Sequence, residues 1–386
     1  MATMAREGQM VVVGWQVYDA THDPLSLGLI GLAEALPFIA VALYAGHLAD
    51  RVSRRTLAIA GTFVLLLSAI ALLIFTVRKD VLVNGRVWPI YLVIFLSGIA
   101  RSFTRPATTA LSADVVPREL FPNSVAWRSS TWQFSAILGP AIGGLLYGFV
   151  GVTGAYAIVS VLMAVALVGL MFVAVIEKAP ERTEMTIGES LRAGLRFLWH
   201  QPVVLPAMTL DLFSVLFGGA TALLPIFAHA LHVGPEGLGV LRAAPAVGSV
   251  IIGLVIAHRP PIKRAGPVLL GCVAMFGVTI ILFALSQNFW LSAFLLMLGG
   301  VFDNVSVVIR GTLVQTLTPT ELLGRVSSVN QIFIGASNEI GAFESGVAAR
   351  LLGTVPSVIF GGVMTLLVVA ITTAVSPSLR KMRELA

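Results

Sequence analysis

Long apolar segments follow one another along nearly the whole chain, separated by short polar stretches. Within each segment the apolar residues are continuous and do not alternate with polar ones, which predicts helices rather than strands. About 20 apolar residues in a helix cross a hydrocarbon layer about 30 Å thick. The pattern therefore predicts an all-α polytopic membrane protein with twelve transmembrane helices, at 1–19, 25–48, 57–77, 88–114, 124–149, 152–176, 203–230, 235–257, 267–286, 289–316, 326–351 and 354–376.

The longest polar interruption divides these helices six and six. We expect an N-terminal six-helix bundle at 1–176, a cytoplasmic central loop at 177–201, and a C-terminal six-helix bundle with a short cytoplasmic tail at 202–386. Within the loop, Ile187 to Trp199 repeats apolar residues at helical spacing. This spacing predicts a short helix that lies along the membrane surface.

The two halves of the chain repeat each other. A shift of 202 residues aligns 116–120 with 318–322, Gly139 with Gly341, Gly144 with Gly346 and Gly151 with Gly353; a shift of 208 aligns Gly31 with Gly239 and Pro37 with Pro245. Two parallel, pseudo-symmetric six-helix halves are a transporter architecture. The second shift places the start of the seventh segment before residue 1, so we expect the first helix to be short or truncated.

The charge content supports a membrane protein. Soluble domains carry about 25% charged residues, whereas this 386-residue chain carries 11%, and 57% of it is hydrophobic. A net charge of +6 could also indicate a nucleic-acid partner, but the basic residues are scattered among short loops. If both termini are cytoplasmic, 15 of the 25 Lys and Arg residues lie inside and 3 outside. Because cytoplasmic loops collect Lys and Arg, we expect cytoplasmic termini and no nucleic-acid partner.

Familiar enzyme motifs are absent from the sequence. It contains no phosphate-binding Gly-x-x-x-x-Gly-Lys-[Ser/Thr], no Gly-x-Ser-x-Gly and no His-Glu-x-x-His. His229 and His232 are interpreted as residues of a helix end at the membrane interface rather than as metal ligands. Cys272 is the single cysteine and excludes an internal disulfide. We therefore expect no catalytic residues, no metal and no cofactor.

A charged loop between the second and third segments reads "GHLADRVSRR" (46–55). It resembles the G-x-x-x-D-R-x-G-R-R loop motif of the major facilitator superfamily, with Ser53 in place of the second glycine. The resemblance covers the whole chain. The alternative interpretation of 46–55 is a basic loop that only sets the orientation of the protein in the membrane. The resemblance implies a conformational latch composed of Gly46, Asp50, Arg51, Arg54, Arg55 and Asp114.

The fifth segment contains "GPAIGG", which is similar to the antiporter motif of that superfamily. The antiporter-like residues are Gly139, Pro140, Gly143 and Gly144. Proline removes one helical hydrogen bond and glycines let helices bend and approach. Ser135 stands where the motif has a further glycine. An ordinary packing face of small residues is the alternative interpretation.

Ionisable residues inside the predicted spans are the main functional candidates, because each costs about 2.5–3.5 kcal/mol at mid-bilayer. The candidates for a substrate or proton pathway are Glu7, Glu34, Arg101, Arg105, Asp211, Arg242, Asp303, Arg310 and Glu339. Arg101 and Asp303 are equivalent under the 202 shift, and Glu34 and Arg242 under the 208 shift. Arg101 and Arg105 share a helix face that the resemblance places on the central cavity, although Arg101 could instead tie helices together.

The resemblance is greatest to the enterobactin-exporter-like branch of drug and siderophore efflux proteins, on 14–37. It implies proton-coupled export of a small organic molecule by alternating access, with protons as the coupling ion. It also implies a monomer in the bilayer of a bacterial inner membrane. An importer or facilitator with the same fold, and a receptor or scaffold that does not transport, are the alternatives.

The charge asymmetry yields a test of orientation. With Cys272 replaced by serine, a cysteine introduced at Asn84 should react with a membrane-impermeant thiol reagent added outside intact cells, because 78–87 is predicted to be external. Labelling only from the cytoplasmic side would reverse the predicted orientation.

Overall fold

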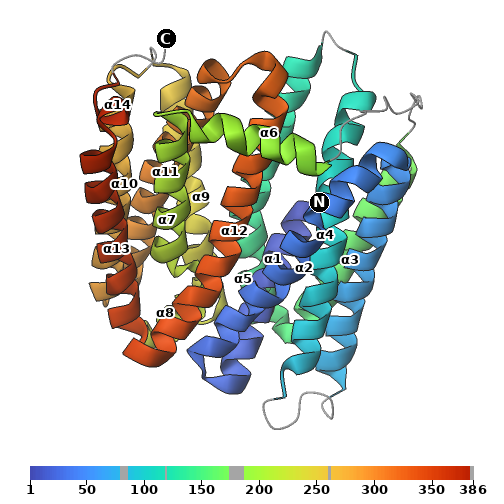
Figure 1. Ribbon diagram of the computed structural model, residues 1–386. Helices are drawn as coiled ribbons and strands as arrows, with labels where there is room; N and C mark the ends of the chain where they lie inside the picture. Colours follow the sequence, from blue (N-terminus) through green and yellow to red (C-terminus); the bar gives the residue numbers. More distant parts are fainter. Residues whose placement is uncertain (79–85, 118–119, 174–186, 260–261, 383–386) are drawn as a thin grey trace. The chain divides into compact units, whose positions relative to one another are not determined.

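The computed structural model describes residues 1–78, 86–117, 120–173, 187–259 and 262–382. Secondary structure in these ranges is helical throughout (Figure 1), which confirms the all-α prediction. The elements are α1 Ala2–Thr21, α2 Pro24–Arg51, α3 Arg54–Val77, α4 Trp88–Asp114, α5 Phe121–Met171, α6 Ile187–Trp199, α7 Val204–Gly218, η3 Ala220–Leu223, α8 Leu224–Ala230, α9 Pro235–Ala257, α10 Ala265–Leu285, α11 Phe289–Leu317, α12 Thr320–Leu352, α13 Thr354–Val375 and α14 Pro377–Arg380.

Helices occupy all twelve predicted segments. Among the described residues, seven stretches are long and apolar enough to cross a membrane: Arg54–Val77, Ser130–Met171, Val204–Ala230, Pro235–Ala257, Ala265–Leu285, Phe289–Leu317 and Thr354–Val375. The second of these stretches covers most of two predicted spans, 124–149 and 152–176. Helices α1, α2, α4 and α12 are outside this set, and they contain the charged candidates Glu7, Glu34, Arg101, Arg105 and Glu339. The fold is that of an all-α polytopic membrane protein.

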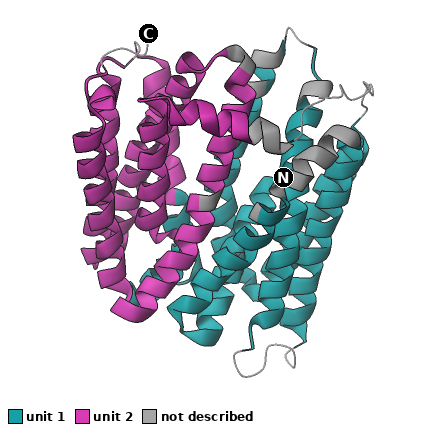
Figure 2. Cartoon of the chain, in the orientation of Figure 1, with its two compact units in different colours: residues 1–184, 225–243 teal, residues 185–224, 244–386 magenta. Residues whose placement is uncertain are grey.

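The chain forms two compact units (Figure 2). Unit 1 comprises residues 1–184 and 225–243, and unit 2 comprises 185–224 and 244–386. The core of unit 1 includes Val13 of α1, Ile94 of α4 and the fully buried Tyr156 of α5. In unit 2, Leu210 of α7 and Leu269 of α10 pack with residues of α11.

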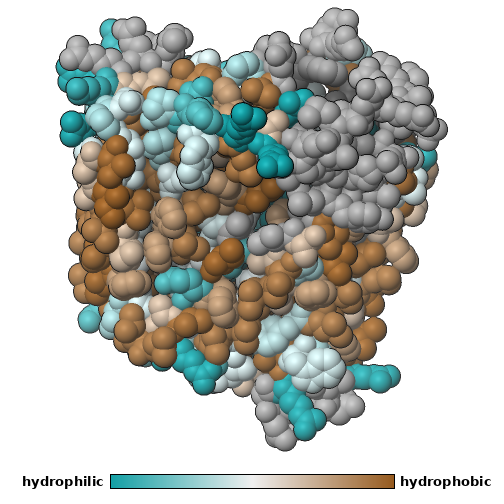
Figure 3. Space-filling view, viewed as in Figure 1, coloured by the Kyte–Doolittle hydropathy of each residue, from teal (hydrophilic) through white to brown (hydrophobic). Residues whose placement is uncertain are grey.

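Many large apolar side chains remain exposed on the helices. On the unit 2 face shown in Figure 3, apolar side chains cover the middle of the helices and polar ones gather nearer the ends. Leu254, Phe294 and Ile371 are among the exposed residues. A surface of this kind needs an apolar solvent, which the hydrocarbon of a bilayer provides.

Two glycines at repeat-related positions have the same unusual backbone. Gly151 interrupts α5 with φ 71°, and Gly353 separates α12 from α13 with φ 90°. Both angles lie in the region that glycine adopts without steric cost. Because the 202-residue shift aligns these positions, the repeat extends from sequence to backbone conformation.

A second repeated feature is a contact between a glycine and a neighbouring helix that contains a proline. A Cβ atom placed on Gly98 of α4 would lie 2.8 Å from Cγ of Pro37 in α2. A Cβ on Gly300 of α11 would lie 1.9 Å from the carbonyl oxygen of Pro245 in α9. The two halves therefore use glycine at equivalent positions to bring equivalent helices together.

The seventh predicted segment is not one continuous helix. Helix α7 ends at Gly218, a short 3₁₀ turn follows, and α8 starts at Leu224. Gly219 has a non-helical conformation (φ −77°, ψ 74°), and Pro225 has no backbone N–H to donate. The hydroxyl of Ser345 donates to the carbonyl oxygen of Gly219 at 3.2 Å. A side chain of α12 thus satisfies a backbone group that the break leaves without a helical partner.

The first helix packs closely on the fifth. Helix α1 has 20 residues, a length sufficient in principle to cross a bilayer. A Cβ atom placed on Gly143 of α5 would lie 2.5 Å from the carbonyl oxygen of Gly8 and 2.6 Å from its Cα. The two backbones are therefore close enough to exclude any side chain at Gly143.

The contact between α1 and α5 predicts that Gly143→Ala lowers the free energy of unfolding by about 1–3 kcal/mol, the usual range for overpacking. Gly169→Ala is the matched control, because a Cβ there meets no atom within 4 Å. Unfolding in detergent, followed by circular dichroism, measures both variants. Equal stability of the two variants would contradict the packing of α1 on α5.

Candidate functional site

A buried carboxylate connects three helices of unit 1. Glu34 of α2 is only 4% exposed. Its Oε1 accepts a hydrogen bond from Nη2 of Arg6 in α1 at 2.5 Å and from Nη1 of Arg101 in α4 at 2.6 Å. Nη1 of Arg6 also donates to Oε1 of Glu7 at 2.9 Å. Charge-assisted hydrogen bonds of this kind are about twice as strong as neutral ones.

The formal charges of this cluster balance. Arg6 and Arg101 contribute two positive charges, and Glu7 and Glu34 two negative charges. Burial of such ions is tolerated only when each has a partner and further hydrogen bonds. The guanidinium of Arg101 also lies 5.1 Å from the ring centroid of Phe38, a cation–π distance. The cluster thus fixes α1, α2 and α4 relative to one another.

A polar face continues along α4 from this cluster. Arg105 and Thr108 are exposed on it. One turn further, the hydroxyl of Ser112 accepts a hydrogen bond from Nη1 of Arg128 in α5 at 2.9 Å. Arg101 and Arg105 lie near the middle of α4, where a charge facing hydrocarbon is costly. The face is therefore suited to contact water or a polar solute.

Unit 2 has its own buried ion pair. Arg310 of α11 contacts Oδ2 of Asp211 in α7, and each residue is 7% exposed. Nε of Arg310 also donates to the hydroxyl of Ser306 at 3.2 Å. A small cavity lies beside the pair, lined by Asp211, Ser214, Val215, Val273, Phe276, Asp303 and Ser306. Two carboxylates therefore line one cavity next to a single buried arginine.

The repeat alone does not identify the ionic partners. It makes Arg101 equivalent to Asp303, and Glu34 to Arg242, but Arg101 and Glu34 contact each other within unit 1. Arg242 of α9 and Glu339 of α12 are partly buried. Arg6 is an ionisable residue of the first predicted span, but its pairing with Glu34 could not be predicted, because spacing along one helix gives no information about the facing helix.

The antiporter-like residues form a packing surface. A Cβ on Gly139 would lie 2.8 Å from the carbonyl oxygen of Met4 in α1. One on Gly144 would lie 2.3 Å from the carbonyl oxygen of Pro235, at the start of α9. The motif therefore brings α5 against α1 on one side and against α9 on the other, within unit 1. Its role in antiport stays a prediction.

Most of the predicted latch cannot be placed. The contacts of Gly46 and the side chains of Asp50, Arg51 and Asp114 lie outside what the structure describes. Nη2 of Arg55 donates to the carbonyl oxygen of Met171, the last residue of α5, at 2.5 Å. The positive charge of an arginine at the C-terminal end of a helix is stabilised by the partial negative charge of the helix dipole there.

His229 is part of an aromatic cluster in unit 1. Its ring stacks on the indole of Trp15 in α1, with ring centroids 4.3 Å apart and an angle of 18° between planes. The ring of Tyr18 meets it edge-on at 5.0 Å. These contacts between α8 and α1 give the histidine a packing role.

The family follows from comparison of the whole chain with known proteins. The sequence model of the Major Facilitator Superfamily matches residues 1–342. The chain belongs to this superfamily. It is a multi-pass membrane transporter and not an enzyme, as the sequence predicted.

Relatives and solved structures agree with this assignment. The enterobactin exporter EntS of Escherichia coli O1:K1 / APEC is 26% identical over 375 residues, which cover 97% of this chain and 89% of the relative. EntS of Shigella boydii serotype 18 matches to the same extent, 26% over 375 residues. The nucleoside transporter NupG has a TM-score of 0.71 at 14% identity, covering 98% of this chain and 95% of that one. A POT family transporter in complex with 5-aminolevulinic acid has a TM-score of 0.72 at 12% identity, with the same coverage, 98% and 95%.

The cluster in unit 1 predicts unequal effects for two conservative substitutions. Glu34→Gln should lower the free energy of unfolding by about 3 kcal/mol, because it leaves two partly buried arginines without the buried carboxylate that they share. Glu7→Gln should cost less than about 1 kcal/mol, since its side chain is 26% exposed and its ion pair among the described residues is with Arg6. Denaturation in detergent compares the two variants, and a Glu7→Gln loss as large as that of Glu34→Gln would contradict the assignment.

Proposed function

We propose that this transporter exports a small organic molecule, of drug-like or siderophore-like kind, in exchange for protons by alternating access. The observation that carries the proposal is the position of Asp303 beside the Asp211–Arg310 ion pair. Export is supported by the relatives named as enterobactin exporters and by the antiporter-like motif in α5. The siderophore-like class is taken from those relatives.

Charge balance favours Asp303 as the residue that binds the proton. Arg310 is in direct contact with Asp211, so its charge is matched by that carboxylate. Among the described residues, Asp303 has no ion pair of its own at hydrogen-bonding distance. An unmatched carboxylate inside a bilayer is electrically balanced when it carries a proton. Asp211 is therefore stabilised by Arg310, whereas Asp303 would be stabilised by a bound proton.

A conformational cycle can change the proton affinity of such a group. If Arg310 approaches Asp303 in one state of the transporter and leaves it in another, the carboxylate releases its proton in the first state and binds one in the second. Proton movement down its gradient then favours one direction of the cycle. The polar face of α4, with Arg105 and Thr108, is the proposed contact for the transported molecule.

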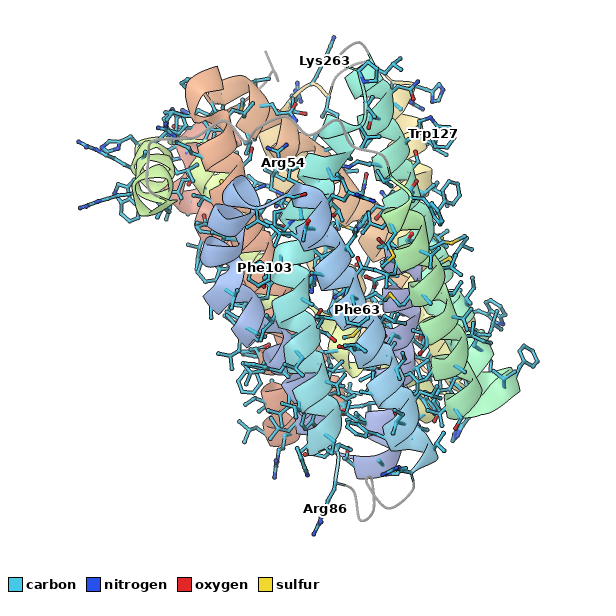
Figure 4. The ribbon with its side chains drawn as sticks, turned by 90° about the vertical axis from the view of Figure 1, so that its right-hand side faces the viewer. Arg54, Phe63, Arg86, Phe103, Trp127 and Lys263 are labelled. Carbon is cyan, nitrogen blue, oxygen red and sulfur yellow. The ribbon has the colours of Figure 1, made fainter. Side chains whose placement is uncertain are left out.

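The remaining features of the proposal concern topology and state. We place both termini in the cytoplasm of a bacterium and expect a monomer in the inner membrane, with the two bundles 1–176 and 202–386 as the moving parts. In Figure 4, Arg54 and Arg86 lie at opposite ends of the unit 1 helices, which fits the predicted inside and outside loops. The latch residues Asp50 and Asp114 are proposed to stabilise one state of the cycle.

Asp303→Asn tests the coupling. The purified variant should fold and keep binding its substrate, but export driven by an imposed pH difference should fall to the level without a gradient, because asparagine cannot exchange a proton. Proteoliposomes and a labelled panel of siderophores and drugs, beginning with enterobactin, provide the measurement. Accumulation in inside-out vesicles establishes the direction.

Asp211→Asn, in the same cavity, is the control that separates a loss of stability from a loss of coupling. It removes the partner of the buried Arg310 and should lower stability by about 3 kcal/mol. Export by Asp303→Asn that rises with the pH difference as steeply as in the parent would make Asp303 structural. Accumulation only in right-side-out vesicles would indicate an importer, and tight binding without flux a receptor.

A further inference from the structure

Within unit 2, helix α6 packs against α7 and α12 by one of its faces. Leu198 is fully buried in a cluster with Val204 and Met208 of α7 and Val326 and Val329 of α12. A Cβ atom placed on Gly194 would lie 3.0 Å from the carbonyl oxygen of Arg325 in α12. In Figure 1, α6 runs crosswise to α7 and α12. The helix therefore covers the starts of two longer helices.

The opposite face of α6 is exposed and combines two arginines with two large apolar residues. Arg192, Leu195, Arg196 and Trp199 follow one another at i, i+3, i+4 and i+7, which places them on one side of a helix. Leu195 is 48% exposed and Trp199 79%. Figure 4 shows α6 end-on at the left, with side chains that point outward.

The depth of this face is set by the next helix. Trp199 precedes Val204, where an apolar stretch long enough to cross the membrane begins, by five residues. The face therefore lies near the boundary between hydrocarbon and water. Tryptophan is enriched at that boundary, and arginines of such helices lie at headgroup level.

We propose that the exposed face of α6 binds anionic phospholipids. Arg192 and Arg196 contact the phosphate groups, and Leu195 and Trp199 enter the boundary of the acyl chains. Charge complementarity decides the lipid class, because two neighbouring guanidinium groups favour a headgroup with net negative charge over a zwitterionic one. Leu195 and Trp199 favour a lipid over a soluble anion, because a soluble anion would leave these two apolar side chains in contact with water.

The effect of lipid bound to the exposed face of α6 would reach α12 through the buried face of α6. The buried face touches α12 at Arg325 and Val329, in the first three turns of that helix. Anionic lipid bound to α6 would therefore stabilise α7 and α12 where they reach the membrane surface. The lipid composition of the membrane would then influence the stability of unit 2 whatever molecule is transported.

Tryptophan quenching measures this binding directly. The full-length protein is placed in nanodiscs of phosphatidylcholine that contain brominated phosphatidylglycerol or brominated phosphatidylcholine at equal mole fraction. The difference in quenching between the parent and Trp199→Phe isolates the signal of Trp199. Because each arginine near an anionic surface is worth about fivefold in binding, the relative binding constant of the two lipids should be roughly 25 for the parent.

Three charge variants decide the interpretation. Arg192→Gln/Arg196→Gln should reduce the relative binding constant to about 1, whereas Arg192→Lys/Arg196→Lys should largely keep the preference. Arg380→Gln/Lys381→Gln removes two exposed charges elsewhere and should leave it unchanged. Size-exclusion chromatography confirms that each variant is folded.

Two results would overturn the proposal. If neither brominated lipid quenches Trp199 in the parent, the exposed face of α6 does not touch the bilayer and is left for an aqueous partner. If Arg192→Gln/Arg196→Gln keeps the full preference for phosphatidylglycerol, the arginines do not select the lipid.

Discussion

Hydrocarbon does not solvate charge, and an ionised side chain in the middle of a bilayer costs about 2.5–3.5 kcal/mol unless a partner or water replaces its hydration. The charged residues of this transporter are arranged under that constraint. Glu34 is matched by Arg6 and Arg101, and Asp211 by Arg310. In each unit these contacts join the first helix of a repeat to the fourth, directly in unit 2 and through Glu34 in unit 1. The positions of the helices and of the charges therefore depend on one another.

Close helix packing makes these contacts possible. Hydrogen bonds between side chains of different helices require backbones that approach closely, and small residues permit this approach in membranes. Gly98 lets α4 approach α2 beside Glu34, since a Cβ there would lie 2.7 Å from the carbonyl oxygen of that residue. Gly139 does the same for α5 and α1 next to Glu7, where a Cβ would lie 2.6 Å from Cβ of that residue. In unit 1, the close contacts at Gly98 and Gly139 therefore lie next to the carboxylate residues of the ionic cluster.

Periodicity and repetition in the sequence predict the helices and much of their packing. The apolar pattern gives the twelve segments and the span of α6, and the 202-residue shift anticipates the matching breaks at Gly151 and Gly353. The partners of the charges cannot be predicted in this way, because they depend on which faces of different helices meet. The same limit applies to the break after α7, where the carbonyl oxygen of Gly219 accepts a hydrogen bond from Ser345 of a distant helix.

The central proposal is that paired carboxylates stay ionised and that Asp303 is the residue that binds and releases the coupled proton. Infrared difference spectroscopy, recorded as the pH is changed, tests it through the carbonyl stretch of protonated carboxyl groups. We predict a band of this kind that appears on acidification and is lost in Asp303→Asn but kept in Glu34→Gln. A spectrum of Asp303→Asn that keeps every such band, or a band that is lost with Glu34 instead, would contradict the claim.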